Sequence, residues 1–164
     1  MMWRHLANRT LRTRTYSTSN KGCIYKEGSS VELQAFAKQH SLTPSLVTQA
    51  LTHKSYLHAS CPTQERFASL GKRVLNLHIA EDAVRKQNFS EKKIENARLF
   101  LAGKKLGIDN LIRWKPASSD PNSLKGQETV VAYSVKAIVG AIYHEKGSVI
   151  AREFVQQHIL NESD

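Results

Sequence analysis

Apolar residues recur every three to four positions along most of the chain, which predicts amphipathic helices, and convincing alternating strands are absent. The fold class is therefore predicted to be all-α. We expect helices over residues 31–40, 44–51, 63–86, 90–106, 128–146 and 151–160, with a surface loop over 115–126.

Local signals indicate how these helices begin, end and pack. Thr43 before Pro44 is typical of an N-cap followed by a proline in the first turn, and Gly107 after two lysines is typical of a helix end. Gly71 lies inside a predicted helix, where glycine costs about 1 kcal/mol relative to alanine, so we expect another helix to approach closely there. The segment 128–146 is apolar almost all round, which predicts a central buried helix. The segment 63–86 carries Phe67, Leu70, Val74, Leu77 and Val84 at the spacing of one apolar helix face.

The net charge of +10 is concentrated at the N-terminus. Residues 1–26 hold six basic residues, no acidic one and many serines and threonines, a composition typical of a mitochondrial transit peptide. Arg14 shortly before Tyr16 and Ser17 also resembles a matrix-processing site. A basic arm that stays attached and binds RNA is the alternative, and the two roles are compatible. We therefore expect a single domain over residues 27–164.

Metal and disulfide chemistry have little support in the sequence. Cys23 and Cys61 imply no disulfide framework. His53, His58 and Cys61 lie within nine residues and could contribute to a zinc site, but no fourth ligand follows at a suitable spacing. We expect His53 to be a structural histidine, and we expect no metal or other cofactor.

Two motifs carry most of the functional information. Residues 64–75 read Gln-Glu-Arg-Phe-Ala-Ser-Leu-Gly-Lys-Arg-Val-Leu, and residues 131–143 read Val-Ala-Tyr-Ser-Val-Lys-Ala-Ile-Val-Gly-Ala-Ile-Tyr. Both resemble the two catalytic helices of ribonuclease III, in the same order. Residues 50–56 and 97–109 resemble further elements of that family, so the resemblance spans about residues 33–160. It implies the helical fold of the ribonuclease III endonuclease domain. Since only four residues follow residue 160, we expect the double-stranded-RNA-binding domain of the bacterial enzymes to be missing.

The resemblance also implies that the catalytic carboxylates are missing. In the family pattern, four acidic residues stand at the positions of Ala68, Lys72, Tyr133 and Lys136. Residues three or four apart lie on one face of a helix, and carboxylates gathered in this way suit the divalent cations that activate water. Here the formal charge of the four side chains changes from −4 to +2. We therefore expect a catalytically degenerate chain that is not an enzyme.

The chain combines a predicted mitochondrial targeting segment, a degenerate nuclease fold and a basic surface. In this combination it resembles the ribonuclease III-like proteins of the mitochondrial large ribosomal subunit, in their short single-domain fungal form. The implied function is structural, in the mitochondrial matrix: binding ribosomal RNA and neighbouring large-subunit proteins, with no membrane span. The alternative is a non-catalytic partner subunit of a mitochondrial RNA-processing ribonuclease.

Ten basic residues, most of them adjacent in sequence, are the candidate contacts to RNA phosphates. They are Lys72, Arg73, Arg85, Lys86, Lys92, Lys93, Lys104, Lys105, Arg113 and Lys115. Lys136 is predicted to lie near Lys72, and two buried ammonium groups repel one another. Either both side chains reach solvent, or Glu65 pairs with one of them, or an RNA phosphate or a partner's acid occupies the site.

The resemblance also bears on self-association. Ribonuclease III domains dimerise through the signature helix, where an aromatic residue enters the other subunit, and Ser69 stands at that position here. We therefore expect weak self-association and a heterodimer with a different, longer ribonuclease III-like ribosomal protein. The candidate interface residues are Phe67, Ser69, Leu70 and Val74.

Overall fold

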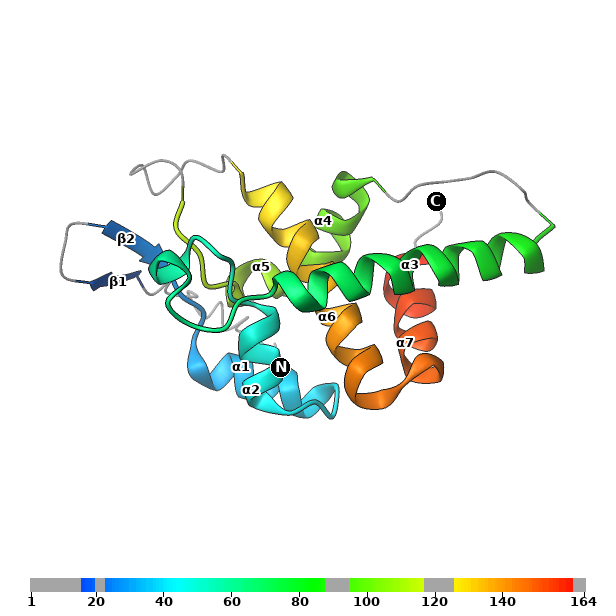
Figure 1. Ribbon diagram of the computed structural model, residues 1–164, viewed down its shortest axis with the longest axis horizontal. Helices are drawn as coiled ribbons and strands as arrows, with labels where there is room; N and C mark the ends of the chain where they lie inside the picture. The colour runs from blue at the N-terminus through cyan, green and yellow to red at the C-terminus, as the bar shows by residue number, and fades with distance from the viewer. Residues whose placement is uncertain (1–15, 20–22, 88–94, 117–125, 161–164) are drawn as a thin grey trace, which may run out of the picture.

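The computed structural model describes residues 16–19, 23–87, 95–116 and 126–160. The predicted all-α class is confirmed: helices dominate the described chain (Figure 1). The elements are β1 (Tyr16–Ser19), β2 (Cys23–Lys26), α1 (Ser30–Gln39), α2 (Pro44–Ala50), η1 (Tyr56–Ala59), α3 (Glu65–Arg85), α4 (Asn96–Lys105), α5 (Ile108–Leu111), α6 (Gln127–Lys146), α7 (Ser148–Val155) and the π-helical turn η2 (Gln156–Leu160).

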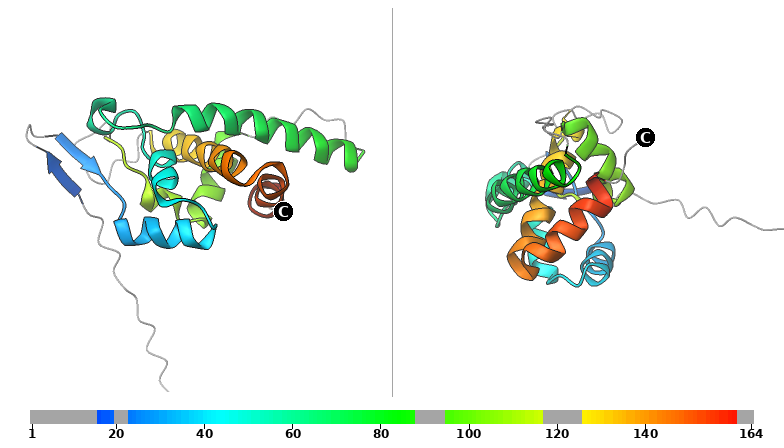
Figure 2. Two further views of the ribbon diagram at one scale, coloured as in Figure 1. Left: turned by 60° about the horizontal axis from the view of Figure 1, so that its bottom comes forward. Right: turned by 90° about the vertical axis from the view of Figure 1, so that its right-hand side faces the viewer.

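Helix α6 is the centre of the fold, as its apolar sequence predicts. Helices α2, α3, α4, α5 and α7 all pack against it, and α3 lies across it at one face (Figures 1 and 2). Its apolar residues from Val130 to Ile142 are almost all buried. A helix enclosed on every side needs apolar residues all round, which explains the absence of a polar stripe.

The crossing of α3 and α6 depends on two glycines. A β-carbon on Gly71 would lie 1.7 Å from the carbonyl oxygen of Lys136, and one on Gly140 would lie 2.1 Å from the carbonyl oxygen of Phe67. The two backbones therefore touch, as expected for Gly71. A buried hydrogen bond adds to this contact, because the Ser134 hydroxyl of α6 donates to Gln64 Oε1 at 2.9 Å, just before α3.

The helix termini agree with most of the sequence signals. Thr43 is the N-cap of α2 with Pro44 in the first turn, and Gly107 has a φ of 72° after α4. The Thr43 hydroxyl does not cap its own helix; it donates to Glu145 Oε1 at 2.9 Å, at the far end of α6. The residue that precedes α4 is Glu95, whereas the predicted start at Ser90 lies outside the described residues.

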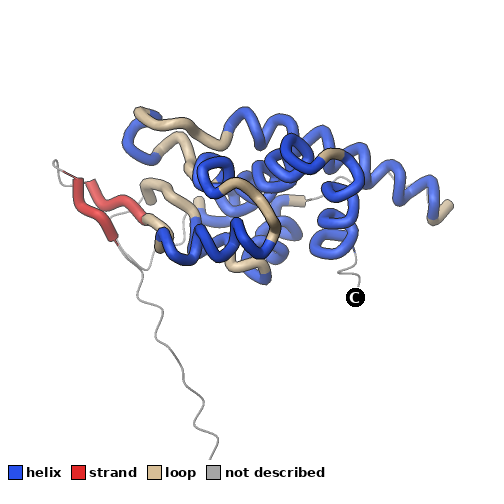
Figure 3. Tube along the Cα trace, turned by 90° about the horizontal axis from the view of Figure 1, so that it is seen from below, coloured by secondary structure: helices blue, strands red, loops and turns tan. Residues whose placement is uncertain are grey.

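Two expectations were wrong. Residues 16–26 include an antiparallel hairpin, in which Tyr16 pairs with Lys26, at one end of the helical body (Figure 3). Each strand is only four residues long, the shortest run over which alternation can be recognised, so periodicity missed the hairpin. Leu77 and Val84 are 50% and 67% exposed instead of buried. Leu77 lies on the solvent side of α3, next to the buried His78, and Val84 lies where the end of α3 projects past the other helices (Figure 1).

The hairpin is attached to the helical body through Lys26. The backbone N–H of Lys26 donates to the Trp114 carbonyl at 2.8 Å, and the Trp114 N–H donates back at 3.0 Å. The Lys26 ammonium also donates to the carbonyl of Asp109 at 2.7 Å, and the residue is only 7% exposed. One of the six cations of the segment 1–26 is therefore part of the folded body. In the described residues, no helix is both long and apolar enough to cross a bilayer.

Candidate nucleic-acid interface

The four positions that the resemblance assigns to catalytic acids lie on the facing sides of α3 and α6. Lys72 is exposed, Tyr133 is 37% exposed and Lys136 is half-buried, whereas Ala68 is only 2% exposed. The glycine contact fixes this arrangement, since Gly71 precedes Lys72 and touches the backbone of Lys136. The crossing therefore brings the side chains of Lys72 and Lys136 to one place on the surface, named the lysine pair below.

The electrostatics of the lysine pair are unfavourable without an anion. Burial lowers the pKa of Lys136, and the neighbouring Lys72 ammonium lowers this pKa further. The Lys136 ammonium donates to Asn96 Oδ1 of α4 at 3.1 Å, a neutral acceptor that provides no compensating charge. Two ammonium groups held together in this way favour a negatively charged group between them.

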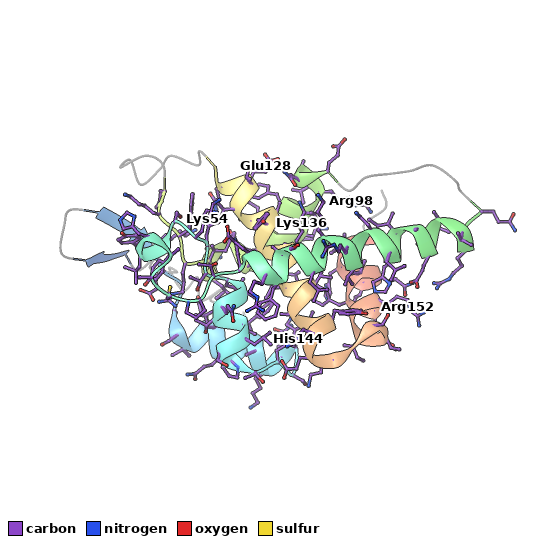
Figure 4. The ribbon with its side chains drawn as sticks, in the orientation of Figure 1. Lys54, Arg98, Glu128, Lys136, His144 and Arg152 are labelled. Atoms are coloured by element: carbon purple, nitrogen blue, oxygen red, sulfur yellow. The ribbon has the colours of Figure 1, made fainter. Side chains whose placement is uncertain are left out.

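The pairing considered for Glu65 is wrong. Its carboxylate lies 3.7 Å from the Lys54 ammonium, in an exposed ion pair at the start of α3. Figure 4 shows Lys136 between the loop that carries Lys54 and the helix that carries Arg98. The Arg98 guanidinium donates to the carbonyls of Ile159 and Leu160 at 3.1 and 3.2 Å, so it is committed to η2.

The residues weighed for a zinc site do not come together around a metal. Within the described ranges, no three histidine, cysteine or acidic side chains are grouped so that they could hold a metal ion. His53 Nδ1 lies 2.9 Å from the Ser55 hydroxyl and accepts the Ser55 N–H at 3.2 Å. Burial lowers the pKa of His53, which favours the neutral ring that such an acceptor needs.

The predicted phosphate contact at Arg113 is not supported. Its guanidinium forms an ion pair with Glu27 Oε1 at 2.8 Å and donates to the Tyr56 hydroxyl at 2.9 Å. The guanidinium carbon also lies 4.4 Å from the centroid of the Tyr56 ring. Arg113 thus connects Glu27, before α1, to Tyr56 of η1, and Glu27 neutralises its charge within the fold.

The remaining basic candidates are distributed over several elements. Arg73 and Arg85 are exposed on α3, while Lys86 forms an ion pair with Asp82 at 2.9 Å. Lys104 lies over the Phe100 ring at 4.6 Å near the end of α4, where Lys105 is also exposed. Lys115 is half-buried, and its backbone N–H donates to Ser55. Lys92 and Lys93 lie outside the described residues.

The candidate partner interface needs one correction. Ser69 is exposed and Phe67 and Leu70 are half-buried on α3, but Val74 is 4% exposed and belongs to the core. Val74 therefore cannot contact a partner without unfolding of the helix. A pocket of about 430 Å³ lies beside Phe67. Its lining residues come from α2, the loop before α3, the segment after α5 and the end of α6, and include Leu46, Cys61, Arg113 and His144.

Sequence reasoning missed Asn96 and the Glu27–Arg113–Tyr56 group. Asn96 begins α4 and becomes a partner of Lys136 only through tertiary packing, 40 residues away along the chain. Glu27 is 86 residues from Arg113, and no sequence spacing links them. The basic candidates could be recognised by their charge, but their internal partners could not.

Comparison with known proteins gives a consistent family assignment. The sequence pattern of the ribonuclease-III-like family matches residues 43–163. The crystal structure of the nuclease domain of ribonuclease III from Campylobacter jejuni superimposes with a TM-score of 0.63 at 21% identity, covering 80% of this chain and 96% of that domain. At this identity the structural likeness establishes the fold.

Sequence relatives include both enzymes and a ribosomal protein. The chain is 31% identical over 154 residues to ribonuclease 3 of Borreliella burgdorferi, covering 84% of this chain and 61% of that protein. It is 29% identical over 135 residues to the large ribosomal subunit protein mL57 of Schizosaccharomyces pombe, covering 76% of this chain and 64% of that protein. The matches span between 49% and 64% of the length of four such relatives.

Proposed function

The chain belongs to the ribonuclease-III-like family, and from that premise we propose that it is a structural, RNA-binding constituent of a mitochondrial large ribosomal subunit and not a nuclease. The observation that carries this proposal is the lysine pair. Two ammonium groups stand where the resemblance places metal-binding carboxylates, and burial together with Lys72 depresses the pKa of Lys136. Ammonium groups do not ligate Mg²⁺, which prefers oxygen ligands, but they attract phosphates.

The similarity to mL57 supports the ribosomal part of the proposal. The net charge of +10 is in keeping with a partner that carries many negative charges. The acid-free composition of residues 1–26 supports the mitochondrial address. Other large-subunit proteins, including a longer ribonuclease III-like one, are the proposed protein partners through the exposed part of α3 around Ser69 and Leu70.

The alternative, a non-catalytic subunit of a mitochondrial processing ribonuclease, uses the same fold and differs in what the chain is bound to. Sedimentation separates the two functions. Mitochondria from cells that express the C-terminally tagged full chain are lysed, and the lysate is centrifuged through a sucrose gradient at moderate and high salt. We expect the tag to sediment with the large ribosomal subunit at both salt concentrations.

A small complex free of the large subunit would favour the processing function, and a tag absent from the mitochondrial fraction would refute the proposed location. A small-subunit ribosomal protein followed in the same gradient is the control for incomplete separation of the subunits.

A further inference from the structure

The lysine pair has the features of a built anion site. Its position is set by backbone contact, since the backbones of α3 and α6 touch at Gly71 and Gly140. Lys72 comes from α3, Lys136 from α6 and Asn96 from α4, so three elements converge there. A site on packed helices is held more precisely than one on a loop.

The charge of this site is not balanced within the described protein. Of the described carboxylates, none forms an ion pair with Lys72 or Lys136. Glu65 forms its ion pair with Lys54. Glu128 lies two turns before Lys136 on α6 and does not pair with it. Among the residues that the structure describes, Asn96 alone accepts a hydrogen bond from Lys136. A half-buried ammonium that keeps two further N–H donors has capacity for a charged acceptor.

A phosphodiester group matches these donors. It carries one negative charge shared by two non-bridging oxygens, so one oxygen can accept from each ammonium. Charge-assisted hydrogen bonds of this kind are about twice as strong as neutral ones. Tyr133 lies one turn before Lys136 on the same helix and is 37% exposed, so its hydroxyl is available as a third donor on that side.

The neighbouring surface favours nucleic acid over a single acidic side chain. Arg66 and Arg73 are exposed on one row of α3, roughly 100–120° around the helix from Lys72, and neither makes an ion pair with a described residue. Cations repeated along one helix suit a polymer that presents a phosphate at every nucleotide. An acidic peptide segment would need several carboxylates at matching intervals.

We infer that Lys72 and Lys136, with Tyr133 beside them, hold one backbone phosphate of the bound RNA at the α3–α6 crossing. The inference rests on the proposed RNA-binding function and names the place where that function is anchored. The site contacts backbone and not bases, so it fixes the position of the RNA without reading its sequence. The family's place for cleaving a phosphodiester thus becomes a place for holding one.

The test compares binding of the full chain to a fluorescein-labelled RNA hairpin across a series of salt concentrations. The variant Lys72→Gln/Lys136→Gln removes both ammonium groups. The control Lys38→Gln/Lys146→Gln removes two exposed ammonium groups from α1 and the end of α6. We expect the site variant to bind at least about tenfold more weakly and to reduce the slope of log affinity against log salt by about one.

The control variant is expected to change both quantities much less, and Lys72→Arg/Lys136→Arg is expected to retain most of the affinity because it keeps both charges. Thermal unfolding of each variant shows whether a loss of binding reflects loss of the fold. Equal weakening by the site and control variants, with folded proteins, would overturn the phosphate site and leave the proposed function intact.

Failure of the unmodified chain to bind the hairpin at any salt concentration would contradict RNA binding itself and the site with it. The chain is then tested with poly-glutamate as a mimic of an acidic partner. Binding that depends on Lys72 and Lys136 would assign the lysine pair to a protein carboxylate in place of a phosphate.

Discussion

Gly71 of α3 and Gly140 of α6 face each other so closely that a β-carbon on either would lie within 3 Å of the backbone nitrogen of the other. Because the obstructing atoms belong to backbone, a side-chain rotation cannot relieve the overlap. This contact determines the position of the lysine pair, and the arrangement of α3 on α6 depends on it.

Replacing Gly71 with alanine is therefore expected to destabilise the protein, although alanine is the better helix former by about 1 kcal/mol. The added methyl group would meet the carbonyl of Lys136, and overpacking of this kind costs about 1–3 kcal/mol or more. Urea unfolding of Gly71→Ala measures the loss. The matched control is Thr129→Ala at an exposed position of α6; an equal or higher stability of Gly71→Ala would show that the helices are not in backbone contact.

A second prediction concerns Glu145, which accepts the Thr43 N–H at 3.0 Å and the Thr43 hydroxyl at 2.9 Å. We expect Glu145→Ala to lower the free energy of unfolding by about 1 kcal/mol at neutral pH, as for the loss of a helix cap. The backbone N–H of Thr43 lowers the pKa of Glu145. A carboxyl whose pKa is lower in the folded state stabilises the fold above its unfolded pKa and loses this contribution as the pH falls through the folded value.

The difference between Glu145→Ala and the unmodified protein should thus shrink in acid. Urea unfolding at neutral and acidic pH measures it, with Glu153→Ala at an exposed position of α7 as control. A difference that stays the same from neutral to acidic pH would show that the ionised carboxylate contributes nothing at this cap.

A third prediction separates partner binding from folding on α3. Leu70 is half-buried at the surface, whereas Val74 is 4% exposed in the core. We expect Leu70→Asp to leave the chain folded and to abolish its association with the longer ribonuclease III-like protein. Val74→Asp buries an unpaired charge, so we expect it to destabilise the chain by about 3–5 kcal/mol. Circular dichroism and co-purification distinguish the two effects.

The isolated chain should self-associate weakly, because Ser69 offers no large apolar side chain to a second copy. Analytical ultracentrifugation checks this expectation, and a tight symmetric homodimer would rule out the proposed heterologous pairing.

A fourth prediction is that the purified chain does not cleave double-stranded RNA in the presence of Mg²⁺ or Mn²⁺. Ala68, Lys72, Tyr133 and Lys136 supply no carboxylate at the positions that the resemblance assigns to metal binding. Ala68→Glu/Lys72→Asp should stay inactive, since half of the ligand positions would still be occupied by tyrosine and lysine. Cleavage by the unmodified chain that disappears on addition of a chelator would show that other residues bind the metal.

The helices could be predicted from the sequence because their signals are local. Periodicity gave α3 and α6 within two residues at each end, and Gly71 indicated the close approach that the structure contains. The strands β1 and β2 were missed because their pairing is a matter of backbone hydrogen bonds and not of side-chain periodicity. Val74 and Leu77 share a helical spacing, but Leu77 lies on the solvent side of α3 while the nearby His78 is buried.

The candidate site could be predicted in outline and not in its contacts. The motifs placed Lys72 and Lys136 near one another, and the fold brings them together. The motifs could not show that Arg113 is neutralised by Glu27 or that Lys136 donates to Asn96, because both partners are distant in sequence. Charge identifies the candidate cations, while tertiary contacts decide which of them are available to an RNA.

Crosslinking in cells tests the central claim, that the chain is bound to ribosomal RNA, most directly. Cells that express the tagged full chain are irradiated with ultraviolet light, and the RNA attached to the purified protein is sequenced. The account predicts that crosslinks concentrate at defined positions of the mitochondrial large-subunit ribosomal RNA and weaken there in Lys72→Gln/Lys136→Gln. Crosslinks that fall mainly on precursor transcripts, or none above an untagged control, would contradict it.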